Sequence, residues 1–258
     1  MRAHVAKPIP RTPPRAELWS ALARSARLWW RSALWFTLIA GVVVGPATVL
    51  GLGGVSAAGA NAAQGPAARL EQQLRTVLLV SVFELFAGSL AEGAIVLGVL
   101  AETGGRRQGP LRMLAAGSER YGRTLPVNAV CMAFTVGGSL LFPVFGLLFW
   151  SLSFIALPVA LAEPDLPVPD VFRRTWDLSR GRRLPLLYLV TGVWALAELT
   201  GRMFEVLGKA APGLPGWAMP SAHAVVTCLV EGFVTVVSVA LYRAFAAAPP
   251  AGPAAWPR

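Results

Sequence analysis

Residues 124–162 read TLPVNAVCMAFTVGGSLLFPVFGLLFWSLSFIALPVALA, which is 39 consecutive positions without a formally charged side chain. As one helix rising 1.5 Å per residue, this stretch would extend about 58 Å, roughly twice the thickness of a bilayer's hydrocarbon core. The stretch therefore predicts two membrane-spanning helices joined by a turn. Proline lacks a backbone N–H and interrupts helices, so we expect the turn at Pro143.

Four other apolar stretches have the length of one span each, namely 33–53, 76–100, 184–207 and 221–245. A helix needs about 20 predominantly apolar residues to cross the hydrocarbon core. The composition agrees, because 55% of the 258 residues are hydrophobic and only 14% are charged, against about a quarter in soluble domains. We expect an all-α integral membrane bundle of six transmembrane helices.

Lysine and arginine are distributed unevenly between the two sides of such a bundle. Nineteen lie in the N-terminal segment, the 101–123 link, the 163–183 link and the C-terminal end, and four lie in the alternate links. Cytoplasmic segments carry the excess of basic residues, so we expect both termini in the cytoplasm. Arginine outnumbers lysine 21 to 2, and we expect a bacterial inner membrane. A cleaved signal peptide ending near VSAAGANAAQG (55–65) is a competing interpretation, although its basic and apolar regions are too long.

Basic segments precede the first, third and fifth predicted spans. They read ELWSALARSARLWWRS (17–32), PLRMLAAGSERYGRTLP (110–126) and VFRRTWDLSRGRRLP (171–185). Apolar residues on one face and arginines on another are typical of helices in the headgroup region. We expect three cytoplasmic-face amphipathic helices and a membrane domain over 16–247, built from units 16–100, 109–162 and 169–247. The tails 1–15 and 248–258 are expected to be disordered.

The third unit carries a family resemblance. Residues 157–187, LPVALAEPDLPVPDVFRRTWDLSRGRRLPLL, and the closing stretch TVVSVALYRAF (235–245) resemble bacterial polytopic proteins related to the glycerophosphoryl diester phosphodiesterase membrane domain. The resemblance implies a fold and a membrane location but no reaction, and we expect no attached hydrolase domain. The link EPDLPVP is longer than the family's usual glycine turn. The matching residues are Pro158, Glu163, Arg173, Arg174, Thr175, Trp176, Leu178, Arg180, Tyr242 and Arg243.

Acidic residues inside the predicted spans are the main candidates for a ligand site. A charge at the bilayer centre costs roughly 2.5 to 3.5 kcal/mol on insertion scales. Glu84 and Glu231 are expected at similar depth near the midplane, and Glu92 lies on the same small, polar helix face as Glu84. One hypothesis is that these glutamates bind a proton or cation, as in a transporter. The alternative is that each is protonated and bonded to a neighbouring helix.

Arginines in 170–185 are the candidates for contacts with anionic lipid headgroups. Val171, Phe172 and Trp176 are expected towards the acyl boundary. A nucleic-acid interface is disfavoured, because spans fix the segment at both ends and two similar segments repeat its design. The candidate headgroup contacts are Arg173, Arg174, Arg180, Arg182, Arg183 and Trp176.

Other polar residues have structural interpretations. Glu198 and Arg202 are expected to form an ion pair along one helix face, near Glu205. The PSAH stretch ending in His223 resembles an element of membrane phosphatidic-acid phosphatases, but the only other histidine is His4 on the opposite predicted side, so this enzyme is rejected. His223 is then a polar helix cap. Cys131 and Cys228 are expected to be packing residues, and Gly41 and Gly45 form a weak GxxxG motif.

No nucleotide, metal or nucleophile motif is present in the sequence, so we expect no cofactor, no metal and no enzymatic activity. The predicted function is a non-enzymatic envelope component that acts at the lipid interface or binds a membrane-protein partner. The alternative is a small-solute or ion transporter that uses the midplane glutamates. The predicted partners are membrane lipids with anionic headgroups, and a homo-oligomer is left open.

Overall fold

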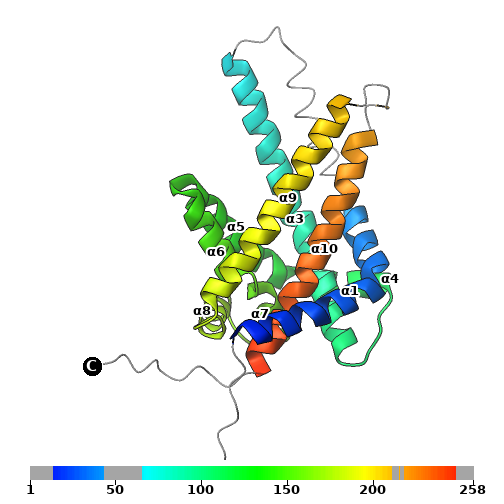
Figure 1. The fold of residues 1–258 in the computed structure, drawn as a ribbon. Helices are drawn as coiled ribbons and strands as arrows, with labels where there is room; N and C mark the ends of the chain where they lie inside the picture. The colour runs from blue at the N-terminus through cyan, green and yellow to red at the C-terminus, as the bar shows by residue number, and fades with distance from the viewer. Residues whose placement is uncertain (1–13, 44–65, 211–214, 216–217, 248–258) are drawn as a thin grey trace, which may run out of the picture.

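The computed structural model describes residues 14–43, 66–210, 215 and 218–247. This part of the chain forms helices and no strands (Figure 1). The fold is thus all-helical, as predicted. The helices are α1 (Pro14–Val43), α3 (Pro66–Thr103), α4 (Pro110–Glu119), α5 (Tyr121–Leu141), α6 (Pro143–Ser153), α7 (Ala156–Ala162), α8 (Val168–Leu178), α9 (Arg183–Ala210) and α10 (Ala218–Ala247).

Within the described residues, four helical segments are long and apolar enough to cross a membrane. They are Leu85–Thr103 in α3, Val144–Ala162 across α6 and α7, Arg183–Ala210 in α9 and Ser221–Ala247 in α10. These four candidate spans support a helical membrane protein, and six crossings stay a prediction. The other two predicted crossings correspond to the end of α1 and to α5, and residues 44–53 of the first lie outside the described part of the chain.

Proline sets the beginning of several helices. Pro110 and Pro143 occupy first-turn positions of α4 and α6, where the missing N–H removes no intrahelical bond. Between α5 and α6, Phe142 has an extended backbone with φ −159° and ψ 133°, and the two helices pack against each other. The turn predicted at Pro143 is therefore present. After α8, Gly181 has φ +79°, a left-handed conformation that glycine adopts without a steric cost.

Buried side chains concentrate where α7 meets its neighbours. Residues 156–161 of α7 are all buried, and they contribute to two apolar clusters, one with α5, α8, α9 and α10 and one with α1, α3 and α10. In Figure 1 the first part of α1 lies across this end of the bundle, and its later part rises beside α10. We call this the α7–α8 end.

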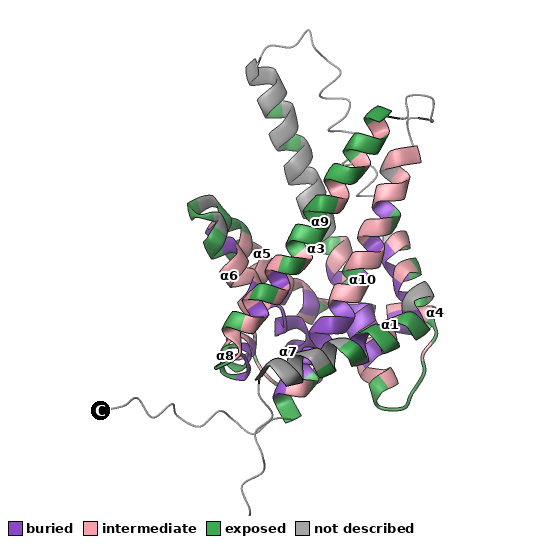
Figure 2. Ribbon diagram, in the orientation of Figure 1, coloured by how far each residue is buried: buried purple, intermediate pink, exposed green. Residues whose placement is uncertain are grey.

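Helix α9 differs from the rest in being little covered by protein. Leu186 and Val190 near its start are buried, whereas its later turns are largely exposed, as the green and pink ribbon in Figure 2 shows. Leu199 and Val206 are 66% and 64% exposed. Such an apolar surface suits hydrocarbon better than water, in keeping with a helix that crosses a membrane.

Helix α8 buries one face and exposes the other. Val171, Thr175 and Leu178 are buried at spacings of four and three residues, whereas Trp176 is 47% exposed. The structure corrects the expectation that Val171 faces the acyl boundary. Val171 belongs to the protein core because its helix face packs on α7, α6 and α10, and Trp176 lies on another face.

Candidate functional site

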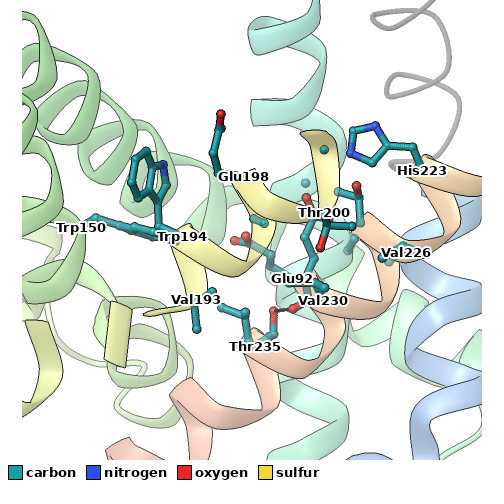
Figure 3. Close-up of a pocket in the computed structure, with 18 of the residues that line it drawn as sticks. Glu92, Trp150, Val193, Trp194, Glu198, Thr200, His223, Val226, Val230 and Thr235 are labelled. Carbon is teal, nitrogen blue, oxygen red and sulfur yellow. Dashed lines mark hydrogen bonds between the residues drawn. The ribbon is translucent and has the colours of Figure 1, made fainter. Parts of the chain in front are cut away.

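A partly open cavity of about 1360 Å³ lies between the helices of the bundle. Its wall is formed by residues of α3, α5, α6, α9 and α10, with smaller contributions from α1 and α7. Most lining side chains are apolar, and polar groups are interspersed among them (Figure 3). We call it the central cavity. Its volume exceeds the 300 to 1,000 Å³ that is typical of small-molecule sites.

Helix α10 contributes a polar stripe to the wall. His223, Thr227, Glu231 and Thr235 follow one another at intervals of four residues, and Ser238 continues the row. Side chains four residues apart lie on one helix face. The hydroxyls of Thr235 and Ser238 donate to the backbone oxygens of Glu231 and Thr235 at 2.9 and 2.8 Å. The deep part of the stripe is therefore held in place by the helix itself.

The second polar group in the wall joins α3 to α5. The Asn128 side-chain amide donates to Glu92 Oε2 at 2.7 Å and to Ser89 Oγ at 3.2 Å. Ser89 and Glu92 are three residues apart on α3, so one asparagine reaches both. Glu92 remains exposed to the cavity, and Figure 3 shows its side chain among the other lining residues. This arrangement fixes one carboxylate oxygen and leaves the other facing the open space.

Two ion pairs lie along α9, towards the end of the bundle where α9 finishes and α10 begins. Arg202 Nε is 3.0 Å from Glu198 Oε1, and Lys209 Nζ is 2.6 Å from Glu205 Oε1. Each pair has i, i+4 spacing on one helix, which is the favourable arrangement for helical ion pairs. Nearby, the rings of Phe204 and His223 stack with centroids 5.4 Å apart. We call this region the α9–α10 end.

The structure brings together some of the sequence-predicted site residues. Glu92 and Glu231 line the same cavity, and Glu198 contacts Arg202. The side chain of Glu84 lies outside the described residues. Sequence reasoning missed Asn128 and Thr227. The spacing of four residues between 223, 227, 231 and 235 could have indicated that Thr227 lies on the same helix face as Glu231. No sequence pattern indicates Asn128, which is identified by its hydrogen bond to Glu92 in the structure.

The arginines predicted to contact headgroups have varied surroundings. Arg173 pairs with Asp170 at 3.1 Å and Arg174 with Glu163 at 3.3 Å. The guanidinium carbon of Arg183 lies 3.5 Å from the centre of the Trp176 ring, and that of Arg182 lies 4.9 Å from the centre of the Phe245 ring. Arg180 is exposed just before Gly181. Several of these charges are thus already engaged by protein groups.

A separate polar cluster ties the α7–α8 end together. Arg174 Nε and the Tyr242 hydroxyl both donate to Glu163 Oε1, at 3.3 and 3.2 Å. Arg123 donates to the backbone oxygens of Ala160, Glu163 and Leu166 at 2.6, 3.0 and 2.5 Å. We call Arg123, Glu163, Arg174 and Tyr242 the Glu163 cluster. It links α5, α7, α8 and α10 and includes three of the residues on which the family resemblance depends.

The remaining candidates do not assemble a reactive centre in the described part of the chain. Cys131 and Cys228 are free thiols, and Cys131 lines the central cavity. No group of three His, Cys, Asp or Glu side chains suited to a metal ion occurs among the described residues. Gly45 of the GxxxG motif lies outside them.

Comparisons with known proteins identified no relative of this chain. No protein-family model matches the chain, and neither a curated protein nor a solved structure matches it. The resemblance to the phosphodiesterase-associated membrane domain therefore stays a prediction.

Proposed function

We propose that the protein is a multi-pass membrane protein that binds an amphipathic small solute in the central cavity, as a transporter does. The observation that carries this proposal is the cavity of about 1360 Å³ with its mixed apolar and polar wall. The cavity is partly open to the surroundings of the bundle, so an occupant can enter it. A mainly apolar wall with a few interspersed polar groups is typical of sites that bind small organic molecules.

The proposed topology has six spans, with the later part of α1 and α5 crossing in addition to the four long apolar segments. Both termini then lie in the cytoplasm of a bacterial inner membrane. The excess of basic residues on that side supports this orientation. In Figure 1 the first part of α1, α4 and α8 all lie at the α7–α8 end, which suits three helices in the cytoplasmic headgroup region.

The test is a binding measurement with a cavity-filling variant. Tritiated triphenylphosphine oxide, a neutral amphiphile, is equilibrated with the purified protein in lipid nanodiscs, and binding to empty nanodiscs is subtracted. Ala197 lines the cavity, whereas Ala195 is exposed on α9 and does not line it. We expect saturable binding in the wild type and in Ala195→Trp, and loss of binding in Ala197→Trp. Equal binding in both variants contradicts the proposal.

A second candidate is the lipid-interface function predicted from the sequence. It is favoured by the exposed Trp176 and Arg180 on the α7–α8 end, with Arg183 stacked over the Trp176 ring. Each basic residue near an anionic leaflet is worth about 1 kcal/mol. Native mass spectrometry of the same preparations separates the two functions. Retained anionic phospholipid without a saturable probe site favours the interface function, and a probe site without retained phospholipid opposes it.

A further inference from the structure

The wall of the central cavity carries a charge opposite to that of the whole chain. Its formally charged residues are four glutamates and two cations, which leaves a formal charge of −2, whereas the chain carries +10. The residues are Glu92, Glu198, Glu205, Glu231, Arg202 and Lys209. A low-dielectric wall focuses the field of such an excess into the space that it encloses.

The two cations are already neutralised near one end of the cavity. Arg202 and Lys209 each pair with the glutamate four residues earlier on α9. Glu231 of α10 lines the wall as well but takes part in a further interaction of its own. The carboxyl group that remains for a ligand is therefore that of Glu92 on α3. No cationic side chain of α3, α5 or α10 lines the cavity in the described part of the chain.

Glu92 has the geometry of a receptor for positive charge. Asn128 donates to its Oε2 at 2.7 Å, which fixes the orientation of the carboxyl group. Among the described residues, no hydrogen bond reaches Oε1, and the side chain faces the cavity. The asparagine thus orients the carboxyl group, and a cation in the cavity would favour its ionised form and contact Oε1.

Aromatic rings supply the complementary surface for the body of such a ligand. Trp150 and Trp194 both line the cavity, and Figure 3 shows them close together on one side of it. Phe204 and His223 form a stacked pair in the lining of α9 and α10. The faces of indole and phenyl rings attract cations and pack against apolar groups. An anion would meet these negative ring faces together with excess carboxylates.

From these observations we infer that the central cavity selects an organic cation, with its positive centre near Glu92 and its apolar body against the tryptophans. This inference rests on the proposed function, since it names the class of solute that the same cavity binds. An inorganic cation alone would leave most of the large apolar surface unfilled. A neutral amphiphile would fill the space but leave the Glu92 carboxylate without a partner for its second oxygen.

Two probes of the same shape and opposite charge test the inference. Tetraphenylphosphonium and tetraphenylborate are each equilibrated with the protein in nanodiscs, with subtraction of empty nanodiscs. We expect the cation to bind the wild type about tenfold or more tightly than the anion, which corresponds to roughly 1.4 kcal/mol. Equal affinity, or a preference for the borate, overturns the inference. This comparison needs no substitution and so does not depend on the stability of a variant.

Substitutions at Glu92 locate the selectivity. Glu92→Gln removes the charge and keeps the shape, and we expect tetraphenylphosphonium to bind about tenfold more weakly. Glu92→Asp should stay within about threefold of the wild type, because it keeps the charge. The control is Glu119→Gln, at an exposed position on α4. It removes the same charge and should bind tetraphenylphosphonium as tightly as the wild type does. Unchanged phosphonium binding by Glu92→Gln contradicts the inference.

The neutral probe keeps the two proposals apart. If triphenylphosphine oxide binds in the cavity while the phosphonium shows no preference and no dependence on Glu92, the cavity binds a solute but the inferred charge selection is wrong. If no probe binds saturably, the proposed function itself fails. Retained binding of the neutral probe by Glu92→Gln also shows that this variant is folded.

Discussion

The α7–α8 end and the central cavity use polar residues in different ways. At the α7–α8 end, the Glu163 cluster directs its hydrogen bonds to protein groups of four helices. In the central cavity, Glu92, Thr227 and His223 line an open space. The same helices serve both regions, since α5 carries Arg123 and Asn128 only five residues apart. The polar residues of the α7–α8 end mainly hold helices together. Those of the cavity also leave donors and acceptors for a ligand, although Asn128 joins α3 to α5 through Glu92 and Ser89.

This contrast separates stability from binding. Groups bonded within a packed region destabilise the protein when they are removed, because their partners are left unsatisfied. Groups that face a cavity and make no hydrogen bond to another helix lose only contacts with solvent or ligand. Substitutions in the Glu163 cluster should therefore change the free energy of unfolding, and those in the cavity wall should change binding.

Arg123→Met should have the largest effect on stability. The substitution leaves the backbone oxygens of Ala160, Glu163 and Leu166 without the donor that joins the end of α7 to α5. Charged hydrogen bonds contribute roughly 1.5 to 3 kcal/mol each, so we expect a loss of about 3 kcal/mol. Unfolding by SDS in mixed micelles measures it. Arg120→Met removes an exposed cation of the same segment and should change stability by less than about 0.5 kcal/mol; equal losses in the two variants would refute the role assigned to Arg123.

Gly117 and Gly88 compare the packing of the α3–α4 contact with that of the cavity wall. A Cβ at Gly117 would lie 2.9 Å from the backbone nitrogen of Ala94, in the contact between α4 and α3. Gly117→Ala should therefore destabilise the protein by about 2 kcal/mol, the usual range for overpacking. Gly88 lines the cavity, and a Cβ there would meet nothing within 4 Å. Gly88→Ala should leave stability unchanged or slightly higher, since alanine favours helix.

The same unfolding titration compares the two alanine variants. Comparable losses at Gly117 and Gly88 would mean that the wall of the cavity is packed as tightly as the α3–α4 contact. That result would count against the open cavity itself, and with it the separation of stability from binding.

Helical character and the turn before Pro143 were predictable from the sequence, because both depend on local patterns of apolar residues and proline. The number of crossings is harder to predict, since in the described part of the chain four helical segments are each apolar and long enough to cross a membrane. The side of α8 that carries Val171 was predicted wrongly. Charge and hydrophobicity identify an amphipathic helix, but they do not show whether its apolar face meets lipid or protein.

The candidate site was only partly predictable. Intramembrane glutamates are conspicuous because they are costly in lipid, and two of the three predicted ones line the cavity. Asn128 and Arg123 carry no such signal. Asn128 binds Glu92, which is 36 residues away in the sequence, and Arg123 binds backbone oxygens at the end of α7 that are 37 or more residues away. Contacts of this range follow from the packing of α3, α5 and α7 and not from any local spacing.

Tyr242→Phe and Thr227→Val give the finest comparison, because both substitutions remove one hydroxyl from α10. The Tyr242 hydroxyl donates to Glu163 Oε1 at 3.2 Å beside Arg174, so its removal should cost about 1 kcal/mol, the usual net value of one hydrogen bond. Thr227 lines the cavity, and Thr227→Val preserves the branched shape, so its unfolding free energy should change by less than about 0.5 kcal/mol. SDS unfolding of both variants checks the order. A greater loss for Thr227→Val would place a structural hydrogen bond in the cavity wall, and α10 would then stabilise the fold along its whole length.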